Sequence, residues 1–158
     1  MHKLLFSVLL VLSFSTLFSK TIINIDMPGS RGLYARAQAY DDFINYQFKT
    51  LDSTFSNAYS KFTLDLDIDK TTLVFIQVRF IKFKVFVEPN KTYNIKTESI
   101  DFKNNEYYPK DVVGYLSPQF EFIGTDSNDI NILIKEFDIK YSEFIYSSYI
   151  YLLRGQGK

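Results

Sequence analysis

A regular alternation of apolar and polar residues constrains the fold of this chain more than any other feature. Between residues 61 and 68 every even position is apolar and every odd position is polar, in the order Lys61-Phe62-Thr63-Leu64-Asp65-Leu66-Asp67-Ile68. Successive side chains of a β-strand point to opposite faces, so this pattern predicts a strand with one buried and one solvated face. The pattern recurs at 44–48, 92–96 and 119–122. The chain is therefore predicted to be mainly β, an antiparallel β-sandwich-like domain, with a partly open barrel as the alternative.

The segment from Leu73 to Val87 changes the phase of this alternation. Val74, Ile76, Val78 and Phe80 are apolar at even positions, whereas Ile81, Phe83, Val85 and Val87 are apolar at odd positions. One strand cannot keep a single buried face across that step, so the segment contains either a β-bulge or a turn between two paired strands. Its length exceeds the roughly 3–10 residues of an ordinary strand. We therefore predict two paired strands.

The last quarter of the chain has the period of a helix. Its apolar residues recur at steps of three and four, which places them on one helical face: Ile130, Leu133, Ile134, Phe137, Tyr141, Phe144 and Ile145. The run Asp126-Ser127-Asn128-Asp129 offers capping side chains and acidic charge ahead of this stretch. We predict an amphipathic helix from Ser127 to Leu153. We expect the segment 126–158 to pack on the sheet or to lead to a further domain.

The first 19 residues have the layout of a cleavable secretory signal. A basic residue, Lys3, precedes an apolar run from Leu4 to Leu12, and the segment ends at Ser15–Ser19 with the small residue Ser19 before the expected cleavage site. A retained membrane anchor is the alternative, but the apolar stretch is shorter than the roughly 20 residues of a spanning helix. We expect cleavage after residue 19, export to the periplasm or the medium, and no membrane span in the mature chain. The rest is then one β domain, residues 20–125, followed by 126–158.

The residue types of the exported part argue against several functions. The chain has no cysteine, and its single histidine is His2, so a Ser-His-Asp triad, a dithiol redox centre and common zinc sites lack their residues. Basic and acidic residues both number 18, which leaves no basic excess for nucleic acid. The acidic run at 65–69 resembles the start of a calcium loop, but Lys70 and Ile76 stand where that loop needs Gly and Glu. We predict no catalytic residue, no cofactor and no metal site; paired-carboxylate hydrolysis stays open as a third alternative.

Tyr34, Arg36 and Tyr40 are the candidate ligand-binding residues. On a strand they share one face, with Gln38 between them, and form a mixed aromatic and polar surface. Such a surface suits a sugar or a peptide. Packing at the edge of the core explains the same pattern, so both interpretations remain open.

Three stretches together resemble the N-terminal accessory domain of exported Bacteroidetes proteins, which often precedes a thioredoxin-like disulfide reductase domain. They are the strand pair around Leu51–Thr54 and Lys61–Leu64, the strand–turn–strand segment Val85–Ile95 with its Glu-Pro-Asn-Lys turn, and the helical segment Asp129–Asp138. Asn90 and Ser60 stand where glycine is common in that family. The resemblance implies an accessory β domain in the cell envelope whose redox partner domain is not part of this sequence.

These observations predict a non-catalytic exported accessory or interaction domain, with a protein or a cell-envelope component as its partner. The resemblance implies that it forms the N-terminal part of a longer thioredoxin-like envelope protein. The alternative is a stand-alone β-sandwich module that binds a glycan or a peptide through exposed aromatic residues or a sheet edge.

Overall fold

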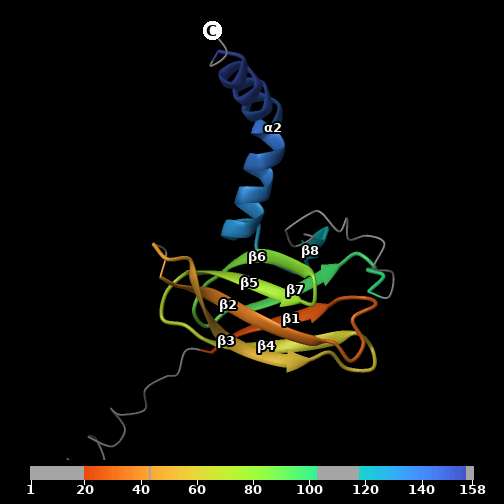
Figure 1. The fold of residues 1–158 in the computed structure, drawn as a ribbon. Helices are drawn as coiled ribbons and strands as arrows, with labels where there is room; N and C mark the ends of the chain where they lie inside the picture. The colour runs from red at the N-terminus through yellow and green to blue at the C-terminus, as the bar shows by residue number, and fades with distance from the viewer. Residues whose placement is uncertain (1–19, 43, 103–117, 156–158) are drawn as a thin grey trace, which may run out of the picture.

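The computed structural model describes residues 20–42, 44–102 and 118–155, which form two four-stranded sheets and one long helix (Figure 1). The sheets stack as two layers, and the helix extends away from them. This arrangement confirms the predicted mainly β, sandwich-like fold with a C-terminal helix. The expected signal segment, residues 1–19, lies outside the described residues. The elements are β1 (Lys20–Asp26), β2 (Tyr34–Asp42), β3 (Gln47–Phe55), β4 (Lys61–Asp67), β5 (Thr72–Val78), β6 (Ile81–Val87), β7 (Thr92–Thr97), β8 (Phe120–Phe122) and α2 (Ile130–Gly155).

The first sheet has the strand order β4-β1-β7-β8. Strand β1 runs antiparallel to β4 and parallel to β7, so Asn24 lies opposite Thr63 on one side and Asn94 on the other. In β4 the apolar residues are buried and the polar residues between them are exposed. Burial therefore alternates along β4 in the same way as the apolar and polar residues of the sequence, because one face of the strand lies against the second sheet.

The second sheet has the order β3-β2-β5-β6. Strands β5 and β6 form a hairpin with Val78 opposite Ile81, joined by a loop of two residues, Arg79 and Phe80. This confirms the prediction of two paired strands in 73–87. The hairpin explains the change of phase, since it pairs even positions of β5 with odd positions of β6 on the same buried face. Arg79 has a φ of 50°, as the first loop residue of such a tight hairpin requires.

Strands β3 and β4 are not a hydrogen-bonded pair, which corrects the expectation for 51–54 and 61–64. Strand β3 pairs with β2 in the second sheet, and β4 pairs with β1 in the first. The chain therefore passes from one layer to the other between them. The Asp52 carboxylate still connects the two edges, because it accepts a hydrogen bond from the N–H of Asp65 at 2.8 Å.

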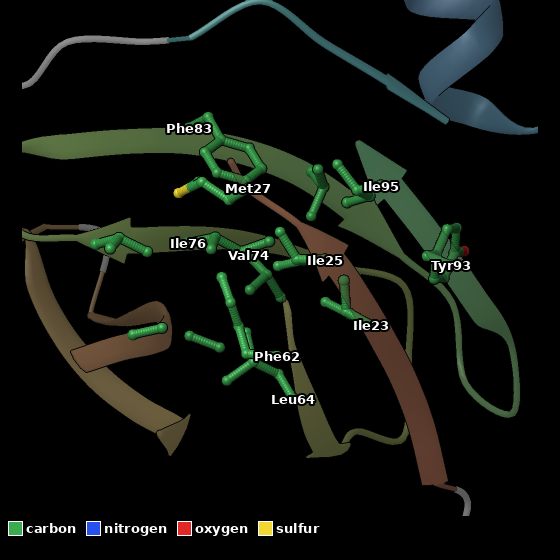
Figure 2. Packing of buried hydrophobic residues seen from close by; sticks show 14 of the residues in the cluster. Ile23, Ile25, Met27, Phe62, Leu64, Val74, Ile76, Phe83, Tyr93 and Ile95 are labelled. Atoms are coloured by element: carbon green, nitrogen blue, oxygen red, sulfur yellow. The ribbon is translucent and has the colours of Figure 1, made fainter. Parts of the chain in front are cut away.

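The core lies between the two sheets (Figure 2). Both layers contribute side chains that are almost completely buried, including Ile23 and Leu64 from the first sheet and Val74 and Ile76 from the second. Tyr93 is also buried, and its hydroxyl oxygen accepts a hydrogen bond from the N–H of Glu88 at 3.0 Å. Burial raises the pKa of the Tyr93 phenol. Because the chain has no cysteine, it has no disulfide, and this packing is a main source of its stability.

Four residues other than glycine adopt the left-handed conformation in the described turns: Tyr46, Ser60, Arg79 and Asn90. Asn90 and Ser60 both have a φ of 62°, a region that favours glycine and tolerates asparagine. A positive φ at the third position of Glu88-Pro89-Asn90-Lys91 is the mark of a type II turn. Asn90 and Ser60 are the two positions at which the resembled family commonly has glycine.

Two sequence-based boundaries are wrong. Residues 44–46 form a turn and not a strand, and β3 begins at Gln47; Ile44 and Tyr46 are exposed. Helix α2 begins at Ile130, three residues later than predicted. The preceding segment is a turn, in which the N–H of Asp129 donates to the carbonyl of Asp126 at 3.0 Å.

Candidate functional site

The outer face of β2 carries all three predicted ligand-binding residues, but they do not form one site. The alanines at 35, 37 and 39 point into the core, so Tyr34, Arg36 and Tyr40 lie on the opposite face. Tyr34 and Tyr40 are six residues apart along the strand, which separates them by about 20 Å at the usual rise. Each tyrosine joins a different group of aromatic residues.

Tyr40 belongs to an aromatic patch formed by Tyr40, Tyr46, Phe48 and Phe75. The Tyr40 ring stacks on Phe48 with centroids 4.7 Å apart, and both rings meet Phe75 edge-on at 5.2 Å. Tyr46 contacts the edge of Tyr40 at 6.1 Å. The pairing of β2 with both β3 and β5 brings these rings together across three strands. The patch therefore consists of rings packed on one another, which offset-stacked and edge-on geometries stabilise.

A lysine covers part of this aromatic patch. The Lys82 Nζ lies 4.0 Å from the centroid of the Phe48 ring and 4.9 Å from that of Phe75, within the range of a cation–π interaction. Partial burial lowers the pKa of Lys82, and the positive charge of Arg36 lowers it further. Sequence analysis missed Phe75 and Lys82 as parts of this surface. The β5–β6 hairpin register, which pairs Gln77 with Lys82, was the signal that could have placed them.

Arg36 is held by the neighbouring strand. Its Nε and Nη2 both donate to the side-chain oxygen of Gln77, at 3.1 and 2.7 Å. Gln77 lies directly opposite Arg36 in the β2–β5 pair. The guanidinium is thus fixed flat against the sheet, and part of its donor capacity is used within the protein.

Tyr34 lies at the other end of β2, beside Phe55 at the end of β3. Their ring centroids are 5.3 Å apart, and both side chains are well exposed. This pair is distinct from the aromatic patch around Tyr40.

Helix α2 is attached to the sandwich by its first turn. Asp129 caps the helix, since its Oδ1 accepts the backbone N–H of Asn131 at 2.9 Å. The Asn131 Oδ1 accepts a hydrogen bond from the N–H of Phe86, and the Asn131 Nδ2 donates one to the Phe86 carbonyl oxygen, both at 2.8 Å. Strand β6 is the edge of its sheet, so this amide satisfies backbone groups that have no partner strand on that side.

Beyond that turn, α2 exposes large apolar side chains. Phe137 and Phe144 are 54% and 69% exposed, and the helix extends away from the sheets (Figure 1). The helix therefore does not pack along the sheet, which was the first of the two expectations for this segment. The exposed apolar residues in its described part are Leu133, Ile134, Phe137, Ile139, Tyr141, Phe144 and Tyr146.

The acidic run at 65–69 lies along the exposed face of β4 and just beyond it. Asp65 forms an ion pair with Lys20 at 2.8 Å. Within 20–42, 44–102 and 118–155, no group of three or more acidic or histidine side chains is arranged to hold a metal ion. Among the described helices, none is long and apolar enough to cross a membrane.

No protein-family model matches the chain, and no curated protein matches its sequence.

Proposed function

We propose that this chain is an exported, non-catalytic interaction domain that binds a partner protein through helix α2. The observation that carries the proposal is a row of five exposed apolar side chains on one face of α2: Leu133, Ile134, Phe137, Tyr141 and Phe144. Ile139 and Tyr146 lie on the opposite side and are not part of this face. Single exposed apolar residues are ordinary on protein surfaces, but a continuous series on one element is typical of an interaction site. The fixed first turn holds the helix in place for such a contact.

The charge of the helix supports a largely apolar contact. Its sequence contains Lys135, Lys140 and Arg154 against Glu136, Asp138 and Glu143. These opposite charges balance, so long-range attraction to a strongly charged surface contributes little. A protein interface with an apolar centre and a polar rim fits this arrangement. The family resemblance suggests a thioredoxin-like domain of the same cell envelope as the partner.

Site-specific photo-crosslinking in the source cells tests this proposal. A photoreactive phenylalanine analogue at Phe144 should form a covalent adduct with a protein partner. The matched control is the same analogue at Ser142, two residues earlier and about 200° round the helix. An adduct at Phe144 and none at Ser142 supports docking through this face, whether its mass indicates a different protein or a second copy. Equal labelling at both positions, or none at either, rejects it.

The export part of the proposal rests on the signal-like segment 1–19 and on the position of β1, whose first residue is Lys20. Cleavage after residue 19 leaves the whole of that strand intact. We expect the mature protein in the source cells to begin at Lys20, as measured by N-terminal sequencing or intact mass. Lys3→Glu should reduce export, because it removes the basic residue of the signal. A cellular protein that retains residues 1–19 contradicts the proposal.

A further inference from the structure

A groove of about 640 Å³ lies over the first sheet, at some distance from the aromatic patch around Tyr40. Side chains of β4, β1 and β7 line it, together with Phe55 at the end of β3 and Ile123 just after β8. Its volume lies within the roughly 300–1,000 Å³ of ordinary ligand sites. We propose that this groove binds a neutral carbohydrate, a function that goes beyond the docking of α2.

A ladder of neutral polar side chains crosses the three strands in the groove. The Thr63 hydroxyl donates to Asn24 Oδ1 at 2.9 Å, and Asn24 Nδ2 donates to Asn94 Oδ1 at 3.0 Å. The strand register sets this ladder, since Asn24 lies directly between the other two residues. Each asparagine amide carries two N–H donors, and within the described part of the chain the ladder uses only one of these four. The ladder thus fixes the amides in place and leaves donors for a ligand.

Three charged side chains, Asp26, Lys61 and Lys96, extend this polar surface. Lys61 Nζ lies 3.4 Å from Asp26 Oδ2, and Lys96 pairs with Asp26 in register on the other side. Amides and a carboxylate side by side can accept and donate hydrogen bonds in pairs, which suits the neighbouring hydroxyls of a sugar ring. Asp26 offsets one of the two lysines, and the single net positive charge that remains is too small to hold a polyanion, so a neutral ligand is favoured.

Exposed apolar groups border the groove. Phe55 is 66% exposed and is supported by the ring of Tyr34, while Ile123 is 48% exposed. A sugar ring has an apolar C–H face as well as hydroxyls, and aromatic rings pack against that face. A polar ladder beside an exposed aromatic pair therefore matches both surfaces of a saccharide. Sequence analysis singled out Tyr34 for sugar binding, and the structure places it beside this groove.

A peptide strand is the competing ligand, and the backbone arrangement disfavours it. An added strand needs an unpaired backbone edge. In this groove β1 is paired on both sides, with β4 and β7. The backbone N–H of Ile123 donates to the carbonyl of Asn94 at 2.8 Å, which covers part of β7 as well. Strand β4 is the edge of this sheet, and there the Asp52 carboxylate accepts a hydrogen bond from the N–H of Asp65 at 2.8 Å. The floor of the groove therefore presents side chains to a ligand, as a saccharide requires.

The experiment is an NMR titration of the mature chain with a panel of neutral trisaccharides: maltotriose, cellotriose, mannotriose, xylotriose and chitotriose. The side-chain amide signals of Asn24 and Asn94 should shift in a saturable way with at least one of them. Asn94→Ala and Phe55→Ala should each weaken binding roughly tenfold or more. Asn128→Ala is the matched control, because it removes an exposed asparagine in the turn before α2 and should leave the affinity unchanged.

Thermal denaturation of each variant separates a loss of binding from a loss of folding. Thr63→Val, which removes one hydroxyl from the ladder and keeps the shape of the side chain, gives a second measurement if Asn94→Ala unfolds. The inference is overturned if no trisaccharide shifts the two amide signals, or if the variants bind as well as the parent. Preferential binding of a sulfated oligosaccharide or of an extended peptide at these residues also overturns it. None of these outcomes depends on the crosslinking through α2.

Discussion

Gly29→Ala should lower the free energy of unfolding by about 4 kcal/mol, a loss that few single substitutions reach. Gly29 lies in the turn between β1 and β2 with a φ of 95°, where an alanine side chain is strained. An added Cβ would overlap the carbonyl oxygen of Ile100 and lie 3.2 Å from its carbonyl carbon. The contacting atoms are backbone, so no side-chain rotation can relieve the overlap. Urea denaturation followed by circular dichroism measures the loss.

A hydrogen bond explains why the two segments cannot move apart easily. The N–H of Ile100 donates to the carbonyl of Pro28 at 3.1 Å, which holds the segment after β7 against this turn. Gly32→Ala is the matched control, since Gly32 has a φ of 70° but no atom lies within 4 Å of the added Cβ. Gly32→Ala should lower the free energy of unfolding by only about 1 kcal/mol, which is the strain of a left-handed backbone at a residue with a side chain. Equal losses in the two variants would contradict the steric argument.

The strands could be predicted from the sequence because burial repeats along each of them. In β4 and β7 every second side chain enters the core. The alternation of apolar and polar residues along each strand therefore indicates that one of its faces is covered by a second sheet. The β5–β6 hairpin was predictable for the same reason, since its change of phase is a local property. Such signals need no knowledge of which strands are neighbours.

Strand pairing could not be predicted in the same way. The parallel contact of β1 with β7 joins Asn24 to Asn94 across 70 residues, and the alternation of either strand fits many partners. The separation of β3 from β4 was missed because two alternating strands joined by a short turn usually form a hairpin. The polar ladder of the groove depends on that register, so its residues could not be grouped from the sequence.

The exposed residues near 44–48 show a second limit of the pattern. Ile44 and Tyr46 alternate with polar residues, as a half-buried strand would, yet both are exposed in a turn. Phe48 points to the outer face, where it packs on Tyr40 and not in the core. Alternation predicts which residues share a face, but it does not say whether that face is covered. The same holds for α2, whose helical period is clear in the sequence and whose apolar residues lie outside the core.

Leu64→Ala should destabilise the domain by about 2–5 kcal/mol, the usual cost of removing a buried leucine side chain. Leu64 is fully buried in the middle of β4 and belongs to the core between the sheets (Figure 2). Its truncation removes apolar contacts and leaves a cavity that the two rigid layers cannot close. The midpoint of urea denaturation should fall, and the dependence of the free energy on urea concentration should remain unchanged.

Two further variants separate this cavity effect from a general sensitivity of β4. Asp67→Ala changes an exposed residue three positions later on the same strand and should stay within about 0.5 kcal/mol of the parent. Leu64→Met keeps nearly the same volume and should cost less than about 1.5 kcal/mol. If Asp67→Ala were as harmful as Leu64→Ala, the division of β4 into a buried and a solvated face would be wrong. A large loss with Leu64→Met would instead mean that side-chain shape, and not the cavity, dominates at this position.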